Sequence, residues 1–148
     1  MAGETQGGFL ISQIKQLQGR IFERLLTEAG ISEFNGAQGR ILYVLWLEDS
    51  LPIVELSRRT GLAKTTLTSM LDRMVQQGYL ERNTDEKDRR QFKISLTMKA
   101  KGMKEKYRMV SAQMSEIFYR HIPPDEIHTF EGTLKKILNN LEDKENER

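Results

Sequence analysis

The stretch LSRRTGLAKTTLTSMLDRMVQQGYLER, Leu56 to Arg82, decides the fold. Its apolar residues recur at helical spacing, which predicts one short helix over 53–60 and a second over 64–77. Gly61 interrupts the pattern and Gly78 ends it. Two helices joined by a tight turn that contains Gly form the helix-turn-helix pattern. Many helical hairpins share this pattern, so the neighbouring residues must show whether it is a DNA-binding motif.

The second helix of the pair is predicted to have two contrasting faces. At i, i+3, i+4 and i+7 its inward face holds Leu67, Met70, Leu71 and Met74. At 100° per residue the outward face holds Thr65, Ser69, Asp72 and Gln76, flanked by Lys64, Thr68 and Arg73. Small hydroxyl side chains near a helix N-terminus allow close approach to DNA and hydrogen bonds to phosphates or base edges. An ordinary solvated polar face is the alternative.

Two alternating segments follow this helix. YLERN (79–83) and FKISLT (92–97) are predicted to form antiparallel strands, joined by the charged loop TDEKDRRQF (84–92). A helix-turn-helix followed directly by such a hairpin is a winged helix. The charge supports this interpretation, because residues 53–100 hold ten Lys and Arg against six Asp and Glu, although the whole chain is only +2.

The loop residues are assigned separate roles. Basic side chains at the tip of a wing can enter a minor groove, so we expect Arg89 to be the groove-entering tip. Arg90 is expected to bind a phosphate or brace the wing, and Lys87 to bind a further phosphate. Asp88 is expected to hold a guanidinium through a bidentate pair. A solvated charged tip is the alternative.

The flanking segments are predicted to be helical. One helix runs to Ala29 and stops at Gly30, and a second begins near Asn35, whose side chain can cap it. A long helix capped by Thr97 is expected to reach about His121, and a last one follows Pro123-Pro124. The predicted fold is therefore mainly α with a small β-wing. The first helix and the last two helices carry apolar stripes that the small central lobe cannot cover. We therefore expect a second copy of the chain to bury them in a symmetric homodimer.

The sequence excludes or disfavours other classes. It has no cysteine, which excludes disulfides, thiolate zinc sites and thiol switches. No secretory signal, membrane span, phosphate-binding loop, dinucleotide-binding turn, nucleophile elbow or HExxH motif is visible, so we expect a cytoplasmic protein that is not an enzyme and has no cofactor. His121, Asp125 and His128 could approach one another around the Pro-Pro bend, but surface residues are the favoured interpretation, so we predict no metal site.

The segment Leu56–Arg82, together with DEKDRRQFKISLT, resembles the MarR family of bacterial transcription regulators. The resemblance implies a winged-helix homodimer on an inverted-repeat operator, with one helix of each lobe in a major groove and the wing in the adjacent minor groove. It divides the chain into a tail and dimerisation helix (1–34), a DNA-binding lobe (35–99) and C-terminal dimerisation helices (100–148). The candidate DNA-binding residues are Lys64, Thr65, Thr66, Thr68, Ser69, Arg73, Lys87, Asp88, Arg89 and Arg90.

Regulation is inferred only from the resemblance, which implies a repressor released by a small, often aromatic, effector. The candidate effector pocket consists of Tyr43, Trp46, Met103 and Tyr107. The alternative is that these residues belong to the core, because aromatic and Met residues at helical spacing usually pack there. A winged-helix module that binds proteins without DNA is the competing function. Lys64 and Arg73 against one Asp72 on the second helix favour DNA.

Overall fold

The computed structural model describes residues 3–31, 36–88 and 90–147. The chain divides into two compact units, Met1–Met114 and Ser115–Arg148. The proposed functions of the predicted segments 1–34, 35–99 and 100–148 stay predictions. The expected Asn35 cap and the Arg89 tip lie outside the described residues. Within the part of the chain that is described, no helix is both long and apolar enough to cross a membrane.

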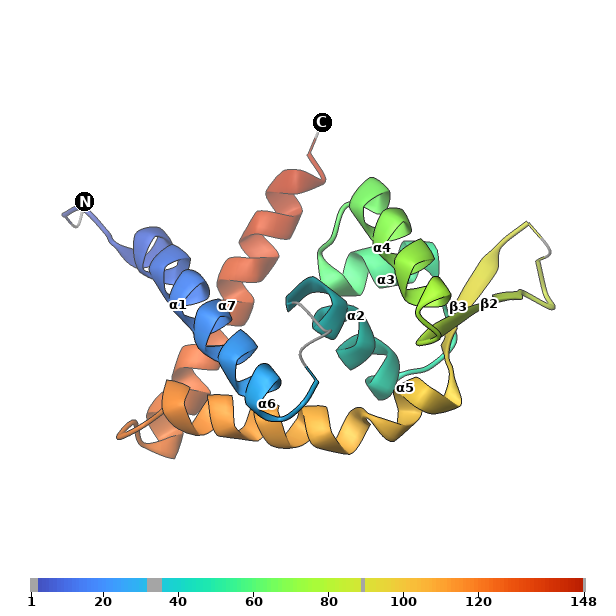
Figure 1. The fold of residues 1–148 in the computed structure, drawn as a ribbon. Coiled ribbons are helices and arrows are strands. Elements are labelled where there is room, and N and C mark those ends of the chain that lie inside the picture. Colours follow the sequence, from blue (N-terminus) through green and yellow to red (C-terminus); the bar gives the residue numbers. More distant parts are fainter. Residues whose placement is uncertain (1–2, 32–35, 89, 148) are drawn as a thin grey trace. The chain divides into compact units, whose positions relative to one another are not determined.

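Four helices of the first unit follow the predicted order (Figure 1): α1 (Gly7–Glu28), α2 (Gly36–Leu47), α3 (Ile53–Thr60) and α4 (Lys64–Gln76). Three of the connections depend on glycine, because Gly30, Gly61 and Gly78 have φ of 79°, 74° and 84°. A residue with a β-carbon is strained in this left-handed region. The stops predicted at these glycines are confirmed.

The strands form a small antiparallel sheet in the order β1-β3-β2, composed of β1 (Leu51–Pro52), β2 (Leu80–Thr84) and β3 (Phe92–Leu96). The β2–β3 hairpin is the predicted wing and projects from the helices of this unit (Figure 1). Its register pairs Leu80 with Leu96 and Thr84 with Phe92. Strand β1 was not predicted, because two residues are too short to show an alternating pattern.

The prediction of a single long helix after Thr97 is wrong in one respect. The structure has two helices, α5 (Met98–Gly102) and α6 (Lys104–Phe118), with a break at Met103. There the Met103 amide donates to the Ala100 carbonyl three residues back, at 3.2 Å, which is the tighter 3₁₀ pattern. The N-cap is confirmed, since the Thr97 hydroxyl accepts from the Ala100 amide at 3.3 Å.

The core of the first unit lies beneath the helix-turn-helix and the sheet. The predicted inward face of α4 is confirmed: Leu67, Leu71 and Met74 are fully buried, and Met70 is half-buried. The other fully buried large side chains are Leu26, Ile31, Ile41, Leu42, Leu45, Leu56, Leu80 and Ile94. These residues come from elements between α1 and β3, so α4 and the root of the wing pack on one common core.

The second unit contains α7 (Pro124–Glu145), which begins with Pro124 in its first turn as the sequence predicts. Before it, Tyr119 packs edge-on against Phe118 and Phe130, at ring-centroid distances of 4.8 and 6.4 Å. The Tyr119 hydroxyl donates to Glu131 Oε2 at 2.7 Å. No described residue of α7 is buried in the single chain, and Phe130, Ile137, Leu138 and Leu141 are exposed.

Candidate nucleic-acid interface

The outward face of α4 is open to solvent. The exposed side chains include every α4 residue that was predicted to contact DNA: Lys64, Thr65, Thr66, Thr68, Ser69 and Arg73. The opposite face of the helix packs into the core, where Leu67, Leu71 and Met74 are fully buried. The hydroxyl of Thr68 donates to the Lys64 carbonyl at 2.8 Å, which leaves its oxygen able to accept. The face therefore offers hydroxyls and two cations on a helix whose opposite face is buried.

The turn between α3 and α4 is fixed by side-chain hydrogen bonds. The Ser57 hydroxyl donates to the Leu62 carbonyl at 2.7 Å, and the Thr60 hydroxyl donates to the Leu56 carbonyl at 2.6 Å. The Thr60 hydroxyl oxygen also accepts the Leu62 amide at 3.3 Å, so the bonds of Ser57 and Thr60 with Leu62 join α3 to the turn, whereas the Thr60–Leu56 bond lies within α3. Arg40 of α2 extends the network by donating to the Thr60 carbonyl at 3.1 Å.

A carboxylate network connects α3 to the end of α2. Glu55 pairs with Arg58 and with Arg59 of its own helix, and Arg59 also reaches Glu48 at 2.9 Å. Hydrogen bonds from Arg58 and then Arg59 lower the pKa of Glu55 from 4.5 to about 2. The carboxylate therefore stays ionised at all ordinary pH values and keeps both guanidinium groups on this side of α3.

Two aspartates make hydrogen bonds within the described part of the wing loop. Asp85 accepts the Lys87 amide at 2.9 Å, and the Asp85 amide donates to the Gln91 carbonyl at 3.1 Å. Asp88 accepts the Arg90 amide and Nε at 3.1 Å each, and Arg90 Nη2 lies 3.5 Å from the second oxygen. These bonds, first from the side chain and then from the backbone of Arg90, lower the pKa of the Asp88 carboxyl. The guanidinium held by Asp88 is thus that of Arg90, and Lys87 is exposed beside it.

One further ion pair was not anticipated from the sequence. Arg82 Nη2 of β2 forms an ion pair with Asp72 Oδ1 on the outward face of α4. A spacing of ten residues across a helix end and a turn leaves no periodic signal, so the pair becomes visible only in the fold. Arg82 is the functional candidate that sequence reasoning missed.

The predicted effector residues have different surroundings. Tyr107 is buried, with its ring centroid 5.0 Å from that of Trp46 and 5.5 Å from that of Phe22. Burial raises the pKa of Tyr107 to about 12. Trp46 donates its Nε1 hydrogen to the Ala100 carbonyl at 3.1 Å. Met103 packs half-buried against the core, whereas Tyr43 is exposed, so the structure brings Trp46 and Tyr107 together but leaves Tyr43 outside the cluster.

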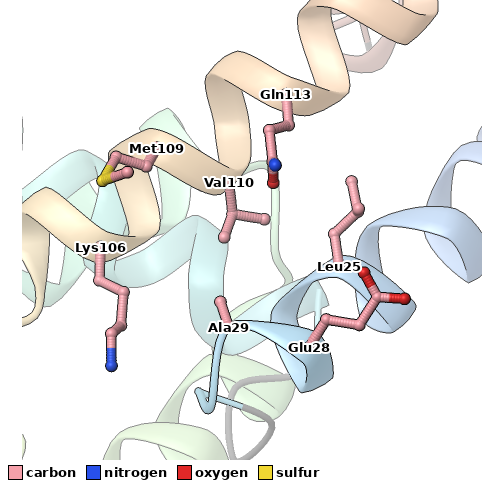
Figure 2. A pocket seen from close by; sticks show the side chains of 7 residues that line it. All are labelled: Leu25, Glu28, Ala29, Lys106, Met109, Val110 and Gln113. Carbon is pink, nitrogen blue, oxygen red and sulfur yellow. The ribbon is translucent and has the colours of Figure 1, made fainter.

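A cavity of about 350 Å³ lies elsewhere, between the end of α1 and α6 (Figure 2). Its lining residues are Leu25, Glu28, Ala29, Lys106, Met109, Val110 and Gln113. None of the four predicted effector residues is among them. In the described ranges of the chain, no three His, Asp or Glu side chains gather closely enough to hold a metal ion, and this includes His121, Asp125 and His128.

Comparisons with known proteins show the family to which the chain is related. The model of the MarR family matches residues 34–92. The transcriptional regulator PrsX of Escherichia coli is 30% identical over 121 residues, which are 76% of this chain and 73% of PrsX. The chain belongs to the MarR family. The transcriptional regulator TtmR of Methylorubrum extorquens is 38% identical over 103 residues, covering 70% of this chain but only about half (51%) of TtmR.

A solved MarR structure has a similar fold. The crystal structure of a mutant MarR from Escherichia coli complexed with operator DNA has a TM-score of 0.78 and 26% identity, and the match covers 88% of this chain and 92% of that one. The winged-helix fold predicted from the sequence is confirmed. MarR-family membership also confirms the predicted class, a transcription regulator and not an enzyme.

Proposed function

We propose that this MarR-family protein is a cytoplasmic, homodimeric repressor that binds an inverted-repeat operator. In this proposal α4 of each protomer enters a major groove and the β2–β3 wing enters the adjacent minor groove. The single observation that carries the proposal is the outward face of α4, where exposed hydroxyls and the cations Lys64 and Arg73 stand on a helix held by buried Leu67 and Leu71.

The residues divide into two kinds of contact. Thr65, Thr66 and Ser69, near the N-terminus of α4, are proposed to read base edges, because short hydroxyl side chains let the helix approach closely. Phosphate contacts are assigned to Lys64, Thr68, Arg73, Lys87 and Arg90. Arg89 is proposed to enter the minor groove, and Asp88 to hold Arg90 in place, as the contacts of Asp88 with that guanidinium support.

Exposed apolar side chains support the homodimer. On α1 they are Phe9, Leu10, Ile11, Ile14 and Leu17, and on α7 they are Phe130, Ile137, Leu138 and Leu141. Exposing an apolar surface of this extent to water is unfavourable, and association with a symmetric second copy of the chain would bury it. A dimer also places two α4 helices in a fixed relation, as an inverted repeat requires.

Release by a small aromatic effector is the further part of the proposal. The proposed site comprises Tyr43, which is exposed on α2, together with Trp46, Met103 and Tyr107, of which Trp46 and Tyr107 are in ring contact. A thermal-shift screen of small aromatic acids and phenols tests this part. A Tyr43→Ala variant should lose the shift caused by any compound that stabilises the wild-type protein, and an unchanged shift would contradict the proposed site.

The test of DNA binding is selection of fragments from the source genome, followed by fluorescence anisotropy over a series of salt concentrations. Affinity should fall steeply as salt rises, because each neutralised phosphate releases condensed counterions. Arg89→Ala should weaken binding to every fragment and reduce the salt slope by about 1. Changes at Thr65 or Ser69 should instead alter which fragments are preferred.

The competing function is a winged-helix module that binds a protein and leaves DNA unbound. If no fragment is retained even at low salt, the competing function is favoured. Normal binding by Arg89→Ala would refute the wing assignment alone.

A further inference from the structure

Asp72 is an anomaly on the face that we place against DNA. It belongs to the same outward stripe as Thr65 and Ser69, and its side chain is 54% exposed. A carboxylate at this position faces the negative charge of the phosphates, and like charges brought together across an interface are costly. Asp72 is the acidic residue of α4, whose thirteen residues are all described.

The chain places one cation against this carboxylate. After α4 the Tyr79 amide donates to the Met74 carbonyl and the Gly78 amide to the Val75 carbonyl, each at 3.0 Å, which is a Schellman motif with Gly78 in the left-handed conformation. The motif reverses the chain, so that β2 runs back beside the helix that it follows. Arg82 on β2 consequently reaches Asp72, one turn before the end of α4.

The turn is also held from the other side. The Thr97 hydroxyl donates to the Gly78 carbonyl at 2.6 Å, and the Thr97 amide donates to the Tyr79 carbonyl at 3.1 Å. Arg82 itself lies opposite Ile94 in the β2–β3 ladder, and Ile94 is fully buried. The backbone that carries the Arg82 side chain is therefore fixed by the sheet and the turn, which reduces the conformational entropy lost when the guanidinium pairs with Asp72.

We infer that Arg82 is a positioning residue for DNA binding, which acts by pairing with Asp72 so that α4 presents no uncompensated carboxylate to the major groove. The inference rests on the proposed function. It assigns Arg82 a role different from that of the loop cations Lys87 and Arg90, which are proposed to contact phosphates themselves. Arg82 is needed because Asp72 is present.

Two substitutions and their combination separate masking from direct contact. Arg82→Gln leaves Asp72 uncovered and should weaken binding to a selected genomic fragment by about tenfold, within the range of measured pair couplings. Asp72→Asn should bind at least as tightly as wild type. The double variant Asp72→Asn/Arg82→Gln has the wild-type net charge and should recover wild-type affinity and salt slope. Arg82→Lys should retain most of the affinity.

Direct contact predicts a different pattern. If Arg82 bound a phosphate, the double variant would stay as weak as Arg82→Gln, and its salt slope would be shallower by about 1. That outcome overturns the inference, as does wild-type binding by Arg82→Gln. If the wild-type chain binds no fragment, the proposed function itself fails. If the wild-type chain binds and Arg82→Gln binds equally well, the inference alone fails, so the two failures are distinguishable.

Control variants exclude indirect effects. Arg120→Gln removes the same charge from an exposed position in the other unit and should change affinity much less than Arg82→Gln. Thermal unfolding should be nearly the same for all five variants, because solvent-exposed ion pairs contribute little to stability. A large loss of stability in Arg82→Gln alone would overturn the inference in favour of a structural role.

Discussion

Gly39 is the position where one added methyl group should have the clearest effect. A β-carbon at Gly39 would overlap the hydroxyl oxygen of Tyr107 and lie 3.1 Å from two carbons of its ring. The ring cannot swing away easily, because Tyr107 is buried between Phe22 and Trp46. Gly39→Ala therefore forces either the Tyr107 ring or helix α2 to move.

Two opposing terms set the magnitude. Replacing Gly by Ala in the interior of a helix favours the fold by about 1 kcal/mol. Overpacking a well-filled core costs about 1–3 kcal/mol. Gly39→Ala should thus lower the free energy of unfolding by about 0–2 kcal/mol, although the helix propensity improves. Gly132→Ala on α7 is the matched control, because no atom lies within 4 Å of its added β-carbon.

Urea unfolding followed by circular dichroism measures both variants at one protein concentration, since the proposed dimerisation would make stability concentration-dependent. Gly39→Ala should be less stable than Gly132→Ala by about 1–3 kcal/mol, the overpacking term alone. Adding Tyr107→Phe removes the overlapping oxygen and should reduce the difference. If Gly39→Ala stabilises the protein as much as Gly132→Ala does, the packing of Tyr107 against α2 described above is wrong.

Three further predictions concern other parts of the chain. The folded-state pKa of Glu55 lies below its ordinary value of 4.5, so the stabilising effect of this carboxylate should be present above about pH 4.5 and lost as the pH falls toward about 2. Glu55→Gln should flatten this part of the stability–pH curve measured by urea unfolding. An unchanged curve would contradict the assignment. Thr97→Ala removes both the N-cap of α5 and the hydroxyl bond to Gly78, and should lower the free energy of unfolding by about 0.5–2 kcal/mol. The control Thr129→Ala, at an exposed position of α7, should lower it by less. Leu138→Glu should convert the proposed dimer to monomer in sedimentation equilibrium, with the neighbouring Lys135→Glu as control, and a dimeric Leu138→Glu would contradict the role of α7.

The local elements were predictable because their signals lie within a few residues. Gly30, Gly61 and Gly78 mark helix ends through a backbone conformation that glycine adopts without strain, and Thr97 marks a helix start through its hydroxyl. The spacing of Leu67, Leu71 and Met74 predicted the buried face of α4, and with it the exposed candidate face. The break at Met103 was missed, since the apolar pattern continues through it.

Of the candidate interface, the sequence by itself determined the order of the elements, the outward face of α4 and the charged hairpin. Only the tertiary structure decided that Arg82 covers Asp72, that Asp88 holds Arg90, and that Trp46 and Tyr107 share one cluster while Tyr43 stays exposed. The physical reason is the range of the interactions. Helix periodicity and capping act between near neighbours, whereas ion pairs and aromatic contacts depend on how turns bring distant residues together.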